Sequence, residues 1–139
     1  MAQRVEEVMT PNPTTLPASA TVTSAARTMR DNDIGDVVVL EESKPCGIVT
    51  DRDLVVRGLA AGKDPENTML GEICSRDLTT VSRKDLVDDA VKLMREKALR
   101  RLPVVDNETV VGVVSIGDLA VDRDPDSALA DISRALPNR

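Results

Sequence analysis

Two octapeptides stand 65 positions apart in this chain: Gly47-Ile48-Val49-Thr50-Asp51-Arg52-Asp53-Leu54 and Gly112-Val113-Val114-Ser115-Ile116-Gly117-Asp118-Leu119. Each begins with a glycine and two β-branched residues, a pattern typical of a short strand. A hydroxyl residue follows, and an aspartate stands three places after the hydroxyl. We predict that the strand gives way to a helix at the hydroxyl. The aspartate then lies one helical turn further along, on roughly the same face.

A hydroxyl beside a carboxylate at a helix N-terminus has two interpretations. The hydroxyl and the free backbone N–H groups suit a phosphate, while the carboxylate accepts hydrogen bonds from ribose hydroxyls. Alternatively, the four side chains only cap helices, because Ser, Thr and Asp are preferred capping residues. The second copy in the same register favours the first interpretation.

The repetition extends well beyond the octapeptides. A shift of 65 positions aligns residues 7–54 with residues 72–119 without a gap. Identical pairs include Thr14/Thr79, Val22/Val87, Ala25/Ala90, Met29/Met94, Val39/Val104, Gly47/Gly112 and Asp53/Asp118. The chain therefore contains a duplicated unit, and the fold must be interpreted as two copies of one pattern.

The duplicated unit predicts an α/β (α+β) fold in which each repeat runs β-α-β-β-α. For the first repeat we expect a helical turn at Val5 to Met9, strands at Thr14 to Leu16, Val37 to Leu40 and Gly47 to Thr50, and helices at Thr21 to Asn32 and Asp51 to Ala61, the last ended by Gly62. For the second we expect a turn at Met69 to Cys74, strands at Leu78 to Val81, Leu102 to Val105 and Val110 to Ser115, a helix at about Leu86 to Ala98 and a short helix after Ser115.

The domain prediction follows from these elements. Residues 1–62 form repeat 1, residues 63–68 a linker, residues 69–122 repeat 2, and residues 123–139 a C-terminal helix and tail. Asp124-Pro125 is typical of a helix start, so the last helix is predicted from Asp126 to Leu136. One repeat buries too little surface to be stable alone. We expect the repeats to pack sheet to sheet about a pseudo-two-fold axis, with two equivalent clefts.

Composition excludes several classes of function. The net charge of −6 and the absence of aromatic residues disfavour nucleic-acid binding. The chain has no histidine, Cys46 and Cys74 are far apart, and there is no Walker-type loop, which argues against a zinc site, a disulfide framework and catalysis. For the same reasons we expect no catalytic cofactor and no metal. No apolar signal segment or membrane span is evident, so we expect a cytoplasmic protein.

Four kinds of sequence motif in this chain resemble those of a known family. Val8-Met9-Thr10-Pro11, Ala25-Ala26-Arg27-Thr28-Met29, Arg101-Leu102-Pro103-Val104-Val105-Asp106 and the two Gly-x-x-[Thr/Ser]-x-x-Asp stretches occur in the same order as in the CBS domain. The repeat resembles that domain, and the pair resembles a Bateman module, from about Val5 to Val121. Within the family the chain looks most like small stand-alone bacterial proteins that carry Thr-Asp-Arg-Asp, here Thr50 to Asp53.

The resemblance implies regulation by ligand binding rather than chemistry. Such modules typically bind AMP, ADP or ATP, and sometimes S-adenosylmethionine. It also implies a homodimer and a regulated protein whose identity the sequence does not give. The alternative is a dimeric interaction protein that works without a nucleotide and whose clefts are vestigial.

The resemblance also implies two clefts that each draw on both repeats. One cleft would use Thr50 and Asp53 with Cys74, Thr79, Leu99, Arg100 and Arg101. The other would use Ser115 and Asp118 with Met9, Thr14, Ile34, Gly35 and Asp36.

The two clefts are predicted to differ in charge. Arg100 and Arg101 replace the Gly35 and Asp36 of the first repeat, and guanidinium groups would grip phosphate oxygens that Asp36 would repel. We therefore expect the Thr50 cleft to be occupied and the Ser115 cleft to be empty or to hold an uncharged group. Alternatively, the two arginines lie on a solvated strand edge or pair with Asp106 or Glu108.

Two further alternatives stay open. The helix after Thr50 carries Arg52 and Arg57, with Lys63 just beyond it, and is either part of a dimer surface or an ordinary exposed face. The last helix either covers a cleft, packs on a partner or folds back on its own module, since its apolar stripe indicates only that one side is buried.

Overall fold

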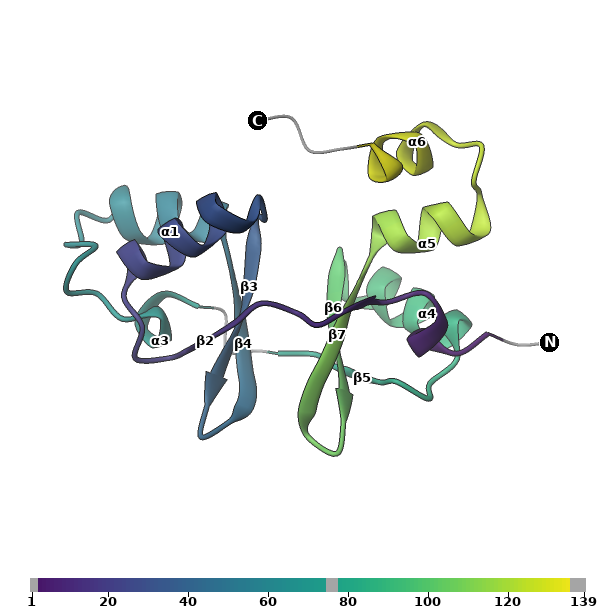
Figure 1. Ribbon diagram of the computed structural model, residues 1–139, viewed down its shortest axis with the longest axis horizontal. Helices are drawn as coiled ribbons and strands as arrows, with labels where there is room; N and C mark the ends of the chain where they lie inside the picture. The colour runs from purple at the N-terminus through teal and green to yellow at the C-terminus, as the bar shows by residue number, and fades with distance from the viewer. Residues whose placement is uncertain (1–2, 75–77, 136–139) are drawn as a thin grey trace. The chain divides into compact units, whose positions relative to one another are not determined.

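The computed structural model describes residues 3–74 and 78–135, which fall into two compact units (Figure 1). Residues 14–74 and Leu78 form one unit, called here the Thr50 unit. Residues 3–13 and 79–135 form the other, called the Ser115 unit. The helices and two separate sheets confirm the predicted α/β class.

The Thr50 unit is built on a three-stranded sheet in the order β2-β3-β4. β2 (Thr15–Pro17) runs parallel to β3 (Asp36–Glu41), and β3 forms a hairpin with β4 (Lys44–Thr50). α1 (Val22–Asn32) joins β2 to β3. The predicted cap is confirmed, because Thr21 accepts a hydrogen bond from Ser24 N–H at 3.1 Å.

The helix after β4 differs from the prediction of one continuous α-helix. Only Asp51–Asp53 is α-helical (α2), and Leu54–Leu59 forms a π-helix (η2) in which Ala60 N–H donates to Val55 C=O at 2.7 Å. The prediction of an α-helix was therefore wrong over these six residues, where the turns are wider. Gly62 follows with φ +73°, as predicted for the end of this helix.

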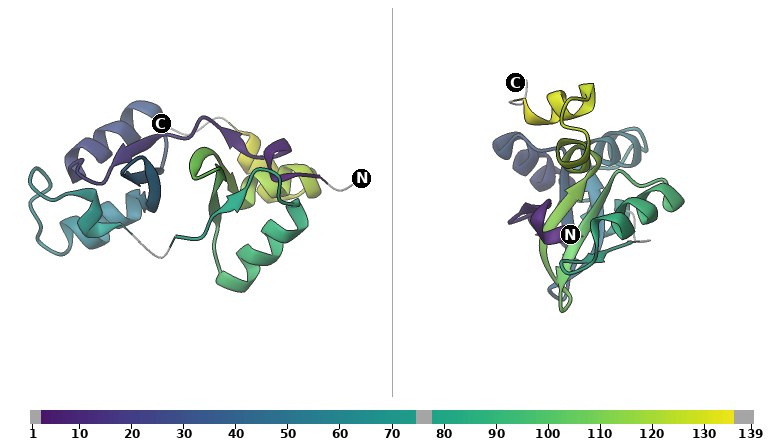
Figure 2. Two further views of the ribbon diagram at one scale, coloured as in Figure 1. Left: turned by 90° about the horizontal axis from the view of Figure 1, so that it is seen from below. Right: turned by 90° about the vertical axis from the view of Figure 1, so that its right-hand side faces the viewer.

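The Ser115 unit is built on a four-stranded sheet in the order β1-β7-β6-β5. Figure 2 shows α4 (Val87–Lys97) and α5 (Ile116–Arg123) beside β6 (Arg101–Asp106) and β7 (Thr109–Ser115). β5 is only Val81–Ser82, so the strand predicted from Leu78 to Val81 was wrong in its bounds: only these two residues pair with β6. β1 (Thr10–Pro11) was not predicted, and its proline is tolerated because an edge strand needs few donors.

Each apolar core includes a short element from the other sequence repeat. The core of the Thr50 unit, built around α1, β3 and β4, also contains Leu70 and Ile73 of α3 (Leu70–Ile73). The core of the Ser115 unit, built around α4, β6 and β7, contains Val5 of the 3₁₀-helix η1 (Val5–Glu7). Val5 and Leu70 are fully buried. The two repeats therefore exchange their first elements.

The exchange is made twice by the same bonds. Val5 N–H donates to Asp85 C=O at 2.8 Å, and Leu70 N–H donates to Ala20 C=O at 2.8 Å. Both pairs obey the 65-residue offset. The predicted repeats 1–62 and 69–122 therefore describe the duplication in the sequence. They do not coincide with the compact units, because each unit contains residues from both repeats.

The last helix was predicted with the wrong start. α6 is Ala128–Arg134, and its N-cap is Ser127, whose hydroxyl accepts from Ala130 N–H at 3.0 Å. The predicted cap at Asp124 instead belongs to a turn, because Ser127 N–H donates to Asp124 C=O at 3.0 Å. The predicted end at residue 136 lies outside the described residues.

Candidate functional site

Thr50 and Asp53 form a reciprocal pair at the start of α2. Thr50 N–H donates to Asp53 Oδ2 at 2.9 Å, and Asp53 N–H donates to Thr50 Oγ1 at 3.1 Å. This capping box arises because the extended backbone of β4 ends at Thr50 and the helix begins at the next residue. The predicted change from strand to helix at the hydroxyl is confirmed.

Ser115 and Asp118 repeat this geometry at the start of α5. Ser115 N–H donates to Asp118 Oδ2 at 2.9 Å, and Asp118 N–H donates to Ser115 Oγ at 3.1 Å. All four residues are half-buried. Capping and ligand binding are compatible at both places, because each cap engages one carboxylate oxygen and leaves the other, Oδ1, directed elsewhere.

The remaining carboxylate oxygens meet different neighbours. Asp53 Oδ1 lies 3.7 Å from Arg57 Nε, a pair one helical turn apart in which the aspartate side chain is only 17% exposed. Asp118 Oδ1 accepts a hydrogen bond from Thr10 Oγ1 at 3.4 Å. Thr10 was not among the predicted site residues, because nothing local in the sequence shows that β1 pairs with β7. The two motifs are therefore alike in their caps and unlike in their surroundings.

The strand register places further predicted residues beside each motif. Asp36 is opposite Thr50 in the β3–β4 pair, and Asp51 N–H donates to Gly35 C=O at 2.9 Å. Directly opposed residues of an antiparallel pair point to the same side of the sheet. Asp36 and Thr50 therefore share the face that α1 does not cover, since the neighbouring Val37 and Val49 enter the core.

The Ser115 unit has the same arrangement with opposite charge. Arg101 is opposite Ser115 in the β6–β7 pair, and Ile116 N–H donates to Arg100 C=O at 2.9 Å. Leu102 and Val114 enter the core, so Arg101 and Ser115 share the face away from the helices. Arginines thus stand beside the Ser115 motif within one unit, where an aspartate stands beside the Thr50 motif.

This adjacency bears on the predicted clefts. Arg100 and Arg101 were assigned to the cleft of Thr50 and Asp53, and Gly35 and Asp36 to that of Ser115 and Asp118. The structure brings each set together with the other motif inside a unit. The predicted clefts, which combine the motif of one repeat with residues of the other, would need contacts between the units and stay a prediction.

The other predicted site residues lie in several settings. Cys74 is buried in the core of the Thr50 unit, and Ile34 and Leu99 pack against the cores of their own units. Thr14 C=O accepts from Val38 N–H at 3.1 Å, and Thr79 is half-buried. Met9 Sδ lies 2.5 Å from the point where a Cβ on Gly112 would lie. Cys74 therefore acts first as a core residue.

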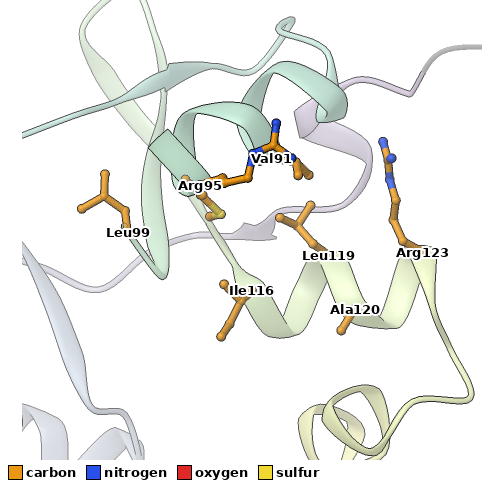
Figure 3. Close-up of a pocket in the computed structure, with 8 residues that line it drawn as sticks. Val91, Arg95, Leu99, Ile116, Leu119, Ala120 and Arg123 are labelled. Carbon is orange, nitrogen blue, oxygen red and sulfur yellow. The ribbon is translucent and has the colours of Figure 1, made fainter. Parts of the chain in front are cut away.

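A groove of about 410 Å³ lies between α4 and α5 in the Ser115 unit (Figure 3). Its lining is mainly apolar and includes Leu99, Ile116 and Leu119, with guanidinium groups from Arg95 and Arg123. Arg123 pairs with Asp88 of α4. The groove runs along the helices, whereas Ser115 and Arg101 share the opposite face of the sheet.

Within residues 3–74 and 78–135 no group of three or more His, Cys, Asp or Glu side chains is arranged to hold a metal ion. Among the helices of those residues, none has both the length and the apolar character needed to cross a bilayer.

Known proteins resemble both the sequence and the fold. The family model for the CBS domain matches residues 5–58 and 70–121. The CBS domain-containing protein YhcV of Bacillus subtilis is 35% identical over 93% of this chain and 94% of its own.

Two solved structures extend the likeness to three dimensions. Hypoxic Response Protein I, solved with two coordinated zinc ions, is 31% identical, with a TM-score of 0.78 over 86% of this chain and 98% of its own. The CBS domain pair of protein MJ0100, solved with 5′-methylthioadenosine and S-adenosyl-L-methionine, is 24% identical, with a TM-score of 0.79 over 91% of this chain and 100% of its own. With two matched repeats, two duplicated capping motifs and this fold, the chain belongs to the CBS domain family as a tandem pair.

Proposed function

We propose that this chain is a regulatory module that binds an adenosyl ligand at its hydroxyl–carboxylate motifs and passes occupancy to a partner surface. The observation that carries the proposal is the duplication of one motif with the same bond lengths at Thr50–Asp53 and Ser115–Asp118. Each motif offers a hydroxyl, which suits a phosphate, and a carboxylate oxygen outside the cap, which suits a ribose. The first helical N–H groups are already used: Asp51 and Ile116 donate to Gly35 C=O and Arg100 C=O, and Asp53 and Asp118 donate to the cap hydroxyls.

The adenine nucleotides AMP, ADP and ATP are the ligands we favour. Arg100 and Arg101 supply positive charge close to one motif, and a charge-assisted hydrogen bond to phosphate contributes about 1.5–3 kcal/mol. S-adenosylmethionine is the second candidate. It is bound by the MJ0100 pair, a protein with this fold. It lacks phosphate, and its amino-acid carboxylate is the group that would meet the arginines.

Calorimetric titration with AMP, ADP, ATP and S-adenosylmethionine tests the proposal. Asp53→Asn and Asp118→Asn are the informative variants. The single carbonyl oxygen of asparagine keeps the cap, while its amide group replaces the acceptor that a ribose hydroxyl needs. Alanine would also remove the cap, and a loss of binding would then be confused with a loss of stability. We expect at least one of the two asparagine variants to bind roughly 10- to 150-fold more weakly.

Asp85→Asn is the matched control. Asp85 Oδ2 accepts from Ser82 N–H at 2.8 Å, which is the same kind of bond in the same unit as Asp118, but at an exposed turn. This variant should bind like the wild type. If none of the four compounds binds at millimolar concentration, or if all three variants bind equally well, the proposal fails.

A nucleotide-independent interaction protein is the second candidate function, and one observation favours it. Val55 and Leu59 of η2 are 55% and 71% exposed, and Val56 beside them is also exposed. Large apolar side chains grouped on one helix mark contact surfaces more often than scattered ones do. We propose that this face contacts a second copy in a homodimer, and light scattering of Val55→Asp against wild type tests it. Dimerisation that is unaffected by Val55→Asp would overturn this assignment.

A further inference from the structure

α5 and α6 form an antiparallel helical hairpin at the end of the described chain. The turn between them is held by Asp124 N–H to Ala120 C=O at 2.8 Å and Ser127 N–H to Asp124 C=O at 3.0 Å. Ala130 of α6 is fully buried, and Figure 1 shows α6 beside α5. Because the chain reverses, the C-terminal end of α6 returns to the first turn of α5, where the Ser115–Asp118 motif lies.

The contact at that turn is close. A Cβ on Gly117 would lie 2.4 Å from Ser133 Oγ and 3.5 Å from Ser115 Oγ. Both hydroxyls therefore border the space immediately over the start of α5. The equivalent position of the first repeat is Arg52, which is exposed. The motif itself therefore tolerates a side chain at this position. At Gly117 the room for one is taken by Ser133 of α6.

We propose that α6 is a lid on the Ser115–Asp118 motif, so that this motif binds its ligand only when α6 has moved away. The inference rests on the proposed function and adds regulation to one of its two sites. A ligand that contacts Ser115 Oγ over the first turn of α5 needs the space that Ser133 borders. Residues 63–69, which correspond to α6 by the 65-residue offset, form no helix, so the Thr50 unit has no equivalent of this lid.

α6 is suited to reversible docking. It has seven residues, and its outer side chains Leu129 and Ile132 are 41% and 71% exposed. Ala130 is its one fully buried side chain among residues 128–135. An element with so little burial opens at a small cost in free energy. The affinity of a covered site is lowered by the fraction of molecules in which the lid is closed.

Gly117→Ala tests the lid from the side of the motif. The new Cβ would displace the Ser133 hydroxyl and lie 3.1 Å from Ser133 Cβ, so the α5–α6 contact is loosened, while alanine otherwise favours α5. The double variant Gly117→Ala/Ser133→Gly restores the room and should let α6 return. Ala130→Arg tests the lid from the other side, because it forces a charge into the α5–α6 contact without altering the motif.

Each variant is made in the Asp53→Asn background, so that titration with ADP reports on the Ser115 motif. Hydrogen exchange of the α6 amides measures release of the helix. We expect faster exchange in Gly117→Ala and in Ala130→Arg, reversed in the Gly117→Ala/Ser133→Gly variant. ADP affinity should be about tenfold higher in Ala130→Arg, which leaves the motif unaltered. Gly117→Ala is followed by exchange alone, because its methyl group would lie 3.5 Å from Ser115 Oγ, in the space that the ligand needs.

The outcomes separate the lid from the proposed function. The titration of the wild type with the four compounds decides the proposed function. If the wild type binds ADP but Ala130→Arg in the Asp53→Asn background does not, the function stands and the lid is overturned. Faster exchange in α6 with unchanged ADP affinity in Ala130→Arg also overturns the lid. Unchanged exchange in both displacing variants overturns it as well, since α6 is then not held by these contacts.

Discussion

Arg101 is directly opposed to Ser115 across the antiparallel strands β6 and β7. The equivalent pair in the other unit is Asp36 and Thr50. One motif therefore has a cation beside its hydroxyl where the other has an anion. If the proposed ligand carries phosphate, this difference should decide which motif holds it.

A double-mutant cycle identifies the motif that Arg101 serves. Arg101→Ala should weaken ADP binding roughly 10- to 150-fold, because a charge-assisted bond to phosphate is lost. Calorimetry of Arg101→Ala combined with Asp53→Asn, and of Arg101→Ala combined with Asp118→Asn, then gives two coupling energies. Non-additivity with Asp118 supports the neighbourhood within the unit, and non-additivity with Asp53 supports the cleft across repeats. Additivity in both cycles would show that Arg101 shares a ligand with neither aspartate.

Two glycine substitutions should have opposite effects on stability. Gly112→Ala places a Cβ 2.8 Å from Thr10 C=O, a backbone atom, and should lower the free energy of unfolding by about 1–3 kcal/mol. Gly58→Ala meets nothing nearer than Val22 Cγ1 at 3.8 Å and lies in a helix, so it should raise that free energy by about 0.5–1 kcal/mol. Urea denaturation followed by circular dichroism measures both. If Gly112→Ala raised the free energy of unfolding as Gly58→Ala does, β1 would not be held against β7.

Both hairpins turn through residues with left-handed backbone. Ser43 has φ 67° and Glu108, its equivalent, has φ 71°. Two-residue hairpin turns require this backbone region, and residues other than glycine adopt it at a steric cost. Ser43→Gly and Glu108→Gly should each stabilise the protein by about 0.5–1 kcal/mol. Glycine at Glu41, in the extended strand β3, is the control and should destabilise it in the same denaturation experiment.

The exchanged element α3 should be essential to its unit. Leu70→Ala removes a fully buried side chain and should cost about 2–5 kcal/mol. Glu66→Ala, at an exposed residue nearby in sequence, should change stability by no more than about 0.5 kcal/mol. Thermal or urea unfolding compares the two, and a Leu70→Ala cost as small as that of Glu66→Ala would contradict the packing described above.

The sequence predicted the local parts of this structure well. Thr21 begins α1, and the hydroxyl–aspartate pairs cap their helices as expected, since these features depend on residues a few positions apart. The duplication also predicted that both repeats would have the same elements.

Features that depend on distant residues were not predictable. The pairing of β1 with β7, the bond from Thr10 to Asp118 and the contact of Ser133 with Gly117 bring together positions with no shared pattern in the sequence. The π-helix at η2 was missed because apolar periodicity does not distinguish a widened turn from an α-turn. For the site, the sequence located the motifs, and only the register revealed which charges stand beside them.

The exchange of first elements makes the Ser115 unit discontinuous along the chain: the Thr50 unit is inserted between its residues 13 and 79. During synthesis Val5 emerges early, but the strands β6 and β7 that bury it emerge only after the whole insertion. The inserted unit can therefore complete its core first, while the outer unit must wait for its C-terminal half. A fragment cut at the sequence repeat would leave each half without one wall of its core, whereas a fragment that spans the Thr50 unit keeps every residue of its core.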